Sequence, residues 1–187
     1  MNYGGRLKFD SLATGIEFLL ISVIQGLAIQ MLAVAASYPL STFQFEYWPY
    51  IISAFTLILL FWTQAILHAF SFIKWPIDIV HTFLYFLASF VEVLAFNQIA
   101  NPFKWFIGGI FFMVTIIFLY MYDLSMIKKS EKDYTKTKAG KELYQHLYTE
   151  QVKEMKLFVP AALLFHTFCA VLIYLYPELF IDQKYHI

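Results

Sequence analysis

Long runs of apolar residues alternate along the chain with short polar segments. Five of these runs are long enough for a helix to cross the roughly 30 Å hydrocarbon core of a bilayer, which takes about 20 residues. They lie at about 12–36, 49–72, 77–98, 103–123 and 157–177. In every run except the first one, a proline stands in the expected first turn of the helix. Proline is tolerated in a first turn because the N–H group that it lacks would have no partner within the helix there. The pattern predicts an all-α fold, a bundle of five transmembrane helices in one membrane domain over residues 1–187.

The first run can also be interpreted as a secretory signal peptide. Basic residues precede it, and Ala33–Ala35 would suit a cleavage site. However, the run has about 25 residues, whereas the apolar part of a signal peptide has about 7–15. It also contains Glu17, Gln25 and Gln30. We therefore expect a transmembrane helix that is retained.

The composition excludes the usual classes of soluble protein. Hydrophobic residues make up 60% of the 187-residue chain and charged residues only 14%, whereas soluble domains are about half apolar and a quarter charged. A chain of this length could not bury five such helices in a soluble core. The single cysteine, Cys169, excludes an internal disulfide and a cysteine-based metal site. We therefore expect the lipid bilayer as the surrounding medium. We expect no nucleic-acid partner, because the lysines are mixed with acidic residues.

The positions of the basic residues predict the orientation of the helices. If the N-terminus is inside, 11 of the 13 lysine and arginine residues fall on the inner side and 2 on the outer side. Inner loops of membrane proteins carry the excess of basic residues, so we expect the N-terminus inside and the C-terminus outside. The small size and short connections favour a bacterial inner (plasma) membrane.

The segment at about 127–156 is the only sizeable polar part of the sequence. Apolar side chains recur there every three or four residues between Leu143 and Met155. This spacing predicts an amphipathic cytosolic helix between the fourth and fifth spans, with a break before it at Ala139–Gly140. One interpretation is a helix that lies on the anionic inner leaflet. The alternative is a docking site for a cytosolic protein partner.

Polar side chains inside the spans are candidates for function, because an ionisable group at membrane depth is costly. The third span carries four of them at intervals of 3, 4 and 7 residues, which places them on one helix face. Two more share a face of the second span. The candidate transport or binding residues are Glu17, Gln64, His68, Asp78, His81, Tyr85, Glu92 and His166.

The expected topology brings these candidates to different depths. All of those in the first three spans, except Tyr85 and Glu92, fall near the inner ends of their helices. We therefore expect them to form one polar cluster on the cytosolic side. Glu92 lies in the outer half of the third span, and His166 lies near the middle of the fifth.

Three interpretations of these polar residues are open. The first is hydrogen bonding between helices, which contributes about 1 kcal/mol or less per contact. The second is an ion or proton route, because titratable groups occur at two depths with Tyr85 between them. The third is a metal or haem site with His68 and His81 as candidate ligands, so the cofactor is undecided. The sequence has no nucleophile motif such as G-x-S-x-G, and we do not predict an enzyme.

The leading functional prediction is movement of a small ion, a proton or a small polar solute through the bundle, with Glu92 as gate or relay. The alternative is a non-catalytic membrane subunit or scaffold that holds partner proteins through the segment at 127–156. A membrane redox subunit with haem or metal is the third. Gly108–Gly109 predicts a close helix contact in the fourth span. Five helices give only a thin wall, which favours a homo-oligomer.

Overall fold

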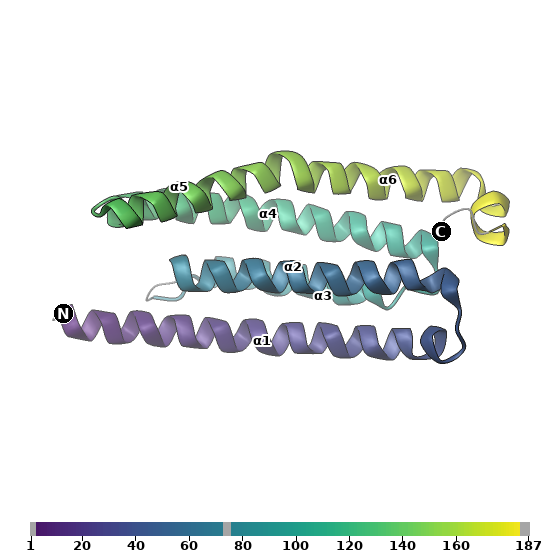
Figure 1. The fold of residues 1–187 in the computed structure, drawn as a ribbon, viewed down its shortest axis with the longest axis horizontal. Helices are drawn as coiled ribbons and strands as arrows, with labels where there is room; N and C mark the ends of the chain where they lie inside the picture. The colour runs from purple at the N-terminus through teal and green to yellow at the C-terminus, as the bar shows by residue number, and fades with distance from the viewer. Residues whose placement is uncertain (1–2, 73–75, 184–187) are drawn as a thin grey trace.

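The computed structural model describes residues 3–72 and 76–183, and all regular structure in this part of the chain is helical (Figure 1). Five helices in it are long and apolar enough to cross a membrane, which confirms the predicted all-α class. The long helices are α1 (Tyr3–Ser41), α2 (Trp48–Phe72), α3 (Ile79–Phe96), α4 (Pro102–Tyr134), α5 (Lys138–Lys153) and α6 (Val159–Leu175). The short helical turns are η1 (Phe45–Tyr47), η2 (Glu154–Phe158) and η3 (Glu178–Asp182). Lys74 and Lys184, which entered the charge count, lie outside the described residues.

The last long helix differs from the prediction, because α5, η2 and α6 form one continuous rod, Lys138–Leu175. Helix α6 itself starts at Val159 with Pro160 in its first turn, as predicted, but it continues from α5 and η2 without a break. A proline inside a helix clashes with the carbonyl group four residues earlier, here that of Lys156, and removes one hydrogen bond. The wide π-helical turn η2 ends two residues before Pro160 and accommodates the ring without breaking the rod.

Two other helix starts follow the expected chemistry, and one does not. The prolines of α2 and α4 stand in the first turn, as predicted. Pro76 does not, because α3 begins three residues later at Ile79. Asp78 caps this start, and its carboxylate accepts hydrogen bonds from the N–H groups of Val80 and His81 at 3.0 and 3.1 Å. The cap therefore fixes the end of α3 that carries His81.

Helix α4 is longer than the predicted fourth span, which ended at residue 123. It continues to Tyr134 because the lysines and acids that follow the apolar part form helices readily and neither glycine nor proline interrupts them. The chain turns at 135–137 instead of the predicted break, and Ala139–Gly140 lies in the first turn of α5. The turn requires glycine there, because a Cβ atom at Gly140 would collide with the carbonyl oxygen of Tyr134.

The segment at about 127–156 is consequently a helical hairpin made of the end of α4, the turn and α5. α5 packs along α4 and runs in line with α6, so the hairpin extends past the ends of α2 and α3 (Figure 1). Lys128 of α4 lies over the Tyr148 ring of α5 at 5.9 Å. An amphipathic helix flat on the inner leaflet would instead lie across the end of the bundle, and α5 does not.

The membrane-crossing helices pack as neighbours in the order α2, α1, α3, α4 and α6. The start of α1 and the α4–α5 turn lie at one end of the bundle, whereas η1, the α3–α4 connection and η3 lie at the other (Figure 1). We call these the inner and the outer end, following the predicted orientation. In the described part of the chain, these connections alternate between the two ends, and the orientation relative to a membrane stays a prediction.

Small residues allow the helices to approach one another closely. Ala13, Ala54 and Ala88 are completely buried in the two apolar clusters that fill the inner and outer parts of the bundle. Gly108 of α4 belongs to the same kind of contact, because a Cβ atom there would overlap Ala95 of α3. This is the close helix contact that the glycine pair predicts.

The outward faces of the helices carry large apolar side chains. Leu19, Leu60, Phe83 and Phe118 are 62%, 60%, 62% and 57% exposed. In water, each Å² of such surface would cost about 25 cal/mol, whereas the hydrocarbon of a bilayer solvates it without this penalty. The fold is that of a multi-pass membrane protein.

Candidate functional site

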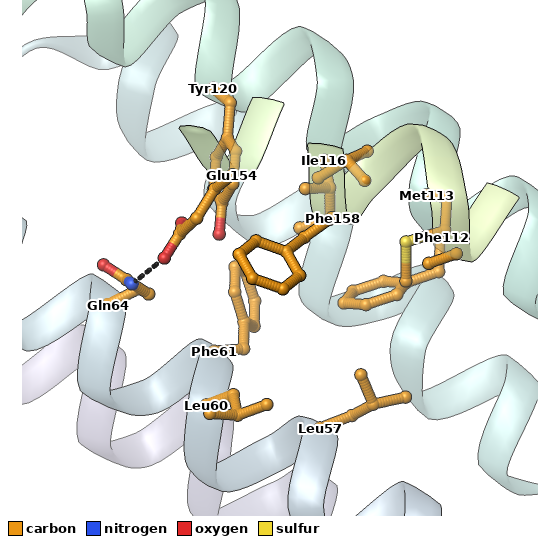
Figure 2. Close-up of a pocket in the computed structure, with 12 residues that line it drawn as sticks. Leu57, Leu60, Phe61, Gln64, Phe112, Met113, Ile116, Tyr120, Glu154 and Phe158 are labelled. Atoms are coloured by element: carbon orange, nitrogen blue, oxygen red, sulfur yellow. Dashed lines mark hydrogen bonds between the residues drawn. The ribbon is translucent and has the colours of Figure 1, made fainter. Parts of the chain in front are cut away.

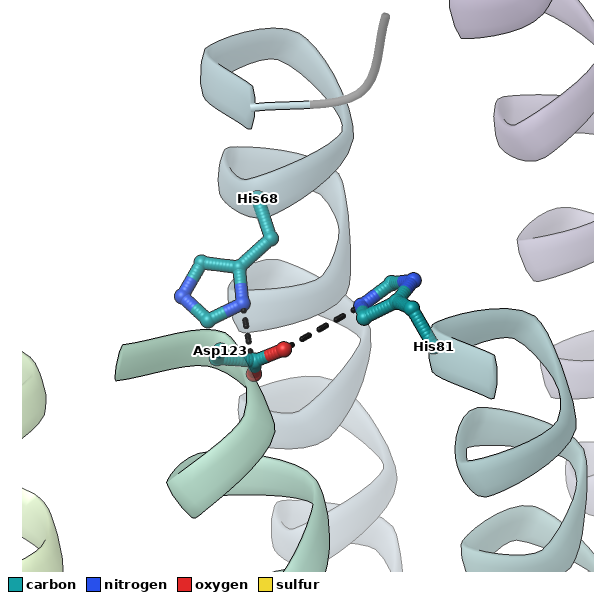
Figure 3. A group of neighbouring side chains, drawn as sticks. All are labelled: His68, His81 and Asp123. Atoms are coloured by element: carbon teal, nitrogen blue, oxygen red, sulfur yellow. Dashed lines mark ion pairs between the residues drawn. The ribbon is translucent and has the colours of Figure 1, made fainter. Parts of the chain in front are cut away.

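A carboxylate of α4 joins two histidines from different helices near the inner end of the bundle. The Nδ1 atom of His68, on α2, lies 3.0 Å from one carboxylate oxygen of Asp123. The Nε2 atom of His81, on α3, lies 3.3 Å from the other oxygen. Figure 3 shows the carboxylate between the two imidazole rings. All three side chains are buried, so this contact ties α2, α3 and α4 together away from water.

The second ring nitrogen of His81 lies near a carboxylate of α1. Its Nδ1 atom lies 3.4 Å from an oxygen of Glu17, which is 1% exposed. The hydroxyl group of Thr82 also approaches Glu17, at 3.4 Å. His81 therefore stands between two buried carboxylates. We call Glu17, His68, His81 and Asp123 the inner cluster.

The inner cluster lies close to the basic end of the hairpin. Asp123 is five residues before Lys128, which corresponds to about 7.5 Å along α4. In the described part of the chain, no lysine or arginine forms an ion pair with Glu17 or Asp123. The charge of the two carboxylates is therefore balanced by histidine alone or by a ligand.

Two residues that the sequence placed in this cluster lie outside it. One Asp78 oxygen caps α3, and the other accepts a hydrogen bond from the Tyr122 hydroxyl group at 2.7 Å. Gln64 turns away from the histidines, and its amide donates a hydrogen bond to the Glu154 carboxylate of η2. The prediction of a five-residue cluster is therefore corrected, because capping and the η2 turn offer these two side chains nearer partners.

A second polar group lies farther along α3, toward the outer end. The side-chain amide of Gln25, on α1, donates a hydrogen bond to the Tyr85 hydroxyl group at 3.0 Å. The Gln25 carbonyl oxygen, the Ser89 hydroxyl group and both carboxyl oxygens of Glu92 have no hydrogen-bond partner in the described part of the chain. Gln25, Ser89 and Glu92 are each 1% exposed, and Tyr85 is 3% exposed. Such orphaned buried groups are rare and costly, and they call for a proton, a water molecule or an ion.

His166 of α6 meets Glu92 at a small cavity. Its Nδ1–H group donates a hydrogen bond to the Ala162 carbonyl oxygen at 2.7 Å, which leaves Nε2 as an acceptor. Its ring lies directly against Gly109 of α4, where any Cβ atom would collide with it. Glu92 and His166 both line a cavity of about 10 Å³, which is close to the minimum for one water molecule. We call Gln25, Tyr85, Ser89, Glu92 and His166 the outer group.

A larger cavity opens beside the inner cluster, between α2, α4 and the junction of α5 with α6. Its volume is about 340 Å³, and its walls are apolar except at one end. Figure 2 shows that end, where Gln64, Glu154 and Tyr120 lie together, with Leu57, Phe112 and Met113 at the opposite end. α2 packs chiefly against α1 and only slightly against α4.

Sequence reasoning missed Asp123 and did not select Gln25. Asp123 is the last residue of the predicted fourth span and is not among the candidate residues of the sequence analysis. It is nevertheless the only acid in α4 before Lys128. That isolated acid was the available signal. Its role depends on the position of α4 next to His68 of α2 and His81 of α3, which no local pattern contains.

Comparison of the chain with protein-family models, with curated proteins and with solved structures found no match. The function is therefore inferred from the chemistry of the inner cluster and the outer group.

Proposed function

We propose that the protein moves protons across the membrane along the inner cluster and the outer group. The observation that carries the proposal is the set of orphaned polar atoms of Gln25, Ser89 and Glu92, buried between the titratable residues of the inner cluster and His166. Groups of this kind at membrane depth are costly and are kept for function. Together they form one polar column through an otherwise apolar bundle.

The two ends of the column lie at different depths. His81 and Glu92 are eleven residues apart on α3, which corresponds to about 16 Å of helix rise. That distance is about half of a bilayer's hydrocarbon thickness. In the proposed orientation, with the N-terminus inside, protons enter at the inner cluster and leave toward the outer end past Glu92.

The small space around Glu92 favours protons over larger cargo. The cavity that Glu92 shares with His166 is about 10 Å³, so it accommodates at most a single water molecule. A hydrated metal cation or a polar solute needs much more room. A proton needs only hydrogen-bonding groups and an occasional water between them.

The test is proton uptake into liposomes that contain the purified protein, driven by a potassium diffusion potential and read with an enclosed pH-sensitive dye. We expect Glu92→Gln to reduce the uptake at least 10-fold, because an amide cannot carry a proton between neighbours. Glu142→Gln changes an exposed acid of α5 in the same way and serves as the matched control. Uptake at the wild-type rate in Glu92→Gln would remove the proposal.

A second candidate function, a non-catalytic membrane subunit, is favoured by the α4–α5 hairpin. The hairpin extends beyond α2 and α3 at the proposed cytosolic end (Figure 1). Such a projection suits a cytosolic protein partner, and the thin bundle suits self-association in a bacterial inner membrane. If this is the function, Lys138→Glu with Lys141→Glu releases a stoichiometric partner recovered from native membranes. Glu92→Gln would then leave that partner bound.

A further inference from the structure

We propose that the inner cluster binds one divalent transition-metal ion, with His68, His81 and Asp123 as ligands. One ligand atom from each of these residues lies within 4.8 Å of the other two, and all three side chains are buried. They come from α2, α3 and α4, so one ion would join three helices. A bound ion would occupy the histidine nitrogens that the proposed proton route uses, so the metal-bound cluster and the proton-carrying cluster are alternative states. Metal binding can nevertheless be measured by itself.

The distances in the cluster suit a metal ion. A zinc ion bound tetrahedrally at about 2.0–2.1 Å holds its ligand atoms about 3.3 Å apart. The His68 nitrogen and the His81 nitrogen lie 3.0 and 3.3 Å from the oxygens of Asp123. Small side-chain rotations are therefore sufficient to place an ion among them.

Glu17 occupies the position of an outer-shell partner. A histidine that binds a metal through one nitrogen usually donates its other N–H group to a carboxylate. The His81 Nδ1 atom lies 3.4 Å from Glu17, while its Nε2 atom faces Asp123. Glu17 would thus hold the His81 ring with Nε2 directed at the ion, as a positioning residue.

Charge balance supports the same conclusion. The cluster holds two buried carboxylates and no basic partner other than histidine in the described part of the chain. Two neutral imidazoles, two carboxylates and one divalent cation have a net charge of zero, which is the inexpensive state in an apolar interior. Without an ion, the cluster needs two extra protons to reach the same charge.

The ligand set also selects among cofactors. Two imidazole nitrogens and a carboxylate suit Zn²⁺, Fe²⁺, Co²⁺ or Ni²⁺, whereas Ca²⁺ and Mg²⁺ prefer oxygen ligands. A haem held by His68 and His81 does not fit, because the Asp123 carboxylate lies between the two rings, where the porphyrin would be (Figure 3).

The experiment is Zn²⁺ binding by the full-length protein in nanodiscs, measured by competition with a chromophoric chelator. We expect one Zn²⁺ per wild-type chain. Glu17→Gln weakens binding about 10- to 100-fold, the usual effect of losing an outer-shell partner, and His81→Ala and Asp123→Asn weaken it further. His146→Ala removes an exposed histidine of α5 and leaves the affinity unchanged.

Co²⁺ provides a reading that does not depend on any variant being folded. An ion held by nitrogen and oxygen ligands in the cluster gives the wild-type protein a visible absorption band, which Zn²⁺ removes. Far-UV circular dichroism identifies variants that have lost their helices. A wild-type protein with neither a Co²⁺ band nor stoichiometric Zn²⁺, or binding equally tight in folded Asp123→Asn, would overturn the inference.

Glu92→Gln separates this inference from the proposed function. Glu92 lies about 16 Å of helix rise from His81, so this variant should bind Zn²⁺ with wild-type affinity while losing proton flux. Loss of Zn²⁺ binding in folded Glu92→Gln protein would contradict the assignment of the site to the inner cluster.

Discussion

At the scale of single residues, Glu92 has the most informative surroundings. Both of its carboxyl oxygens are buried, and neither has a hydrogen-bond partner in the described part of the chain. An ionised carboxylate without compensation would cost several kcal/mol in such a place, so a proton or another cation has to accompany it. Gln25 and Ser89 provide neighbouring polar atoms that are also orphaned, and the proposed proton route runs past all three residues.

Gly109 offers a test of His166, which shares a small cavity with Glu92. In Gly109→Ala, the new methyl group collides with the His166 ring. We expect an overpacking penalty of about 1–3 kcal/mol and reduced proton flux, measured by thermal unfolding and in liposomes.

Gly26→Ala on α1 is the matched control for this variant. A Cβ atom there has nothing within 4 Å, so stability should be unchanged or higher by up to about 1 kcal/mol. If Gly109→Ala kept wild-type stability and flux, His166 would not belong to the column as described.

At the scale of helices, α4 organises the site. It supplies Asp123 to the inner cluster, Gly109 to the His166 contact and Tyr122 to the Asp78 carboxylate. It packs against α3 on one side and α6 on the other. The site therefore depends on the position of one helix relative to its neighbours more than on any short motif.

The start of α3 provides the prediction at this scale. Asp78→Ala removes both the N-cap, worth about 1 kcal/mol, and the hydrogen bond from Tyr122. We expect a loss of about 1–2 kcal/mol in unfolding free energy, measured by denaturation in detergent. Tyr122→Phe removes the hydrogen bond alone and should cost less. An equal loss in the two variants would show that the cap contributes nothing.

The sequence predicts helices better than it predicts their contacts. The five apolar runs are long enough to cross a bilayer, where only a helix satisfies its own backbone hydrogen bonds within one segment, and all five are helical. The ends of the helices are harder to predict where one residue type favours both a helix and a break. The lysines after Ile127 are polar and suggest a loop, yet they are good helix formers, so α4 continues to Tyr134. Pro160 suggests a helix start, yet the π-helical turn before it keeps the rod continuous.

The candidate site shows the same division. Helical spacing alone places His81, Tyr85 and Glu92 on one face of α3, and all three are buried. It cannot show that Gln64 meets Glu154, because these residues are ninety positions apart. Nor can it show that Asp123 lies between two histidines, since that arrangement depends on three helices packing together.

At the scale of the whole molecule, a polar column runs through a bundle whose outer faces are apolar. Lipid surrounds exposed side chains such as Leu19 and Phe83, while the titratable groups are shielded inside. The inner cluster lies near the end with most of the lysines, and Glu92 lies in the other half. In the proposed function, protons pass between side chains of this column, because the cavity of about 10 Å³ at Glu92 has no room for a hydrated ion.

Ion selectivity of the wild-type protein tests this account most directly. Proton, Na⁺ and K⁺ fluxes are measured in the same liposome preparation under equal driving force, against protein-free liposomes. The account predicts proton flux above the protein-free level and no added flux of Na⁺ or K⁺. Proton flux equal to that of protein-free liposomes, or K⁺ flux comparable to the proton flux, would contradict it.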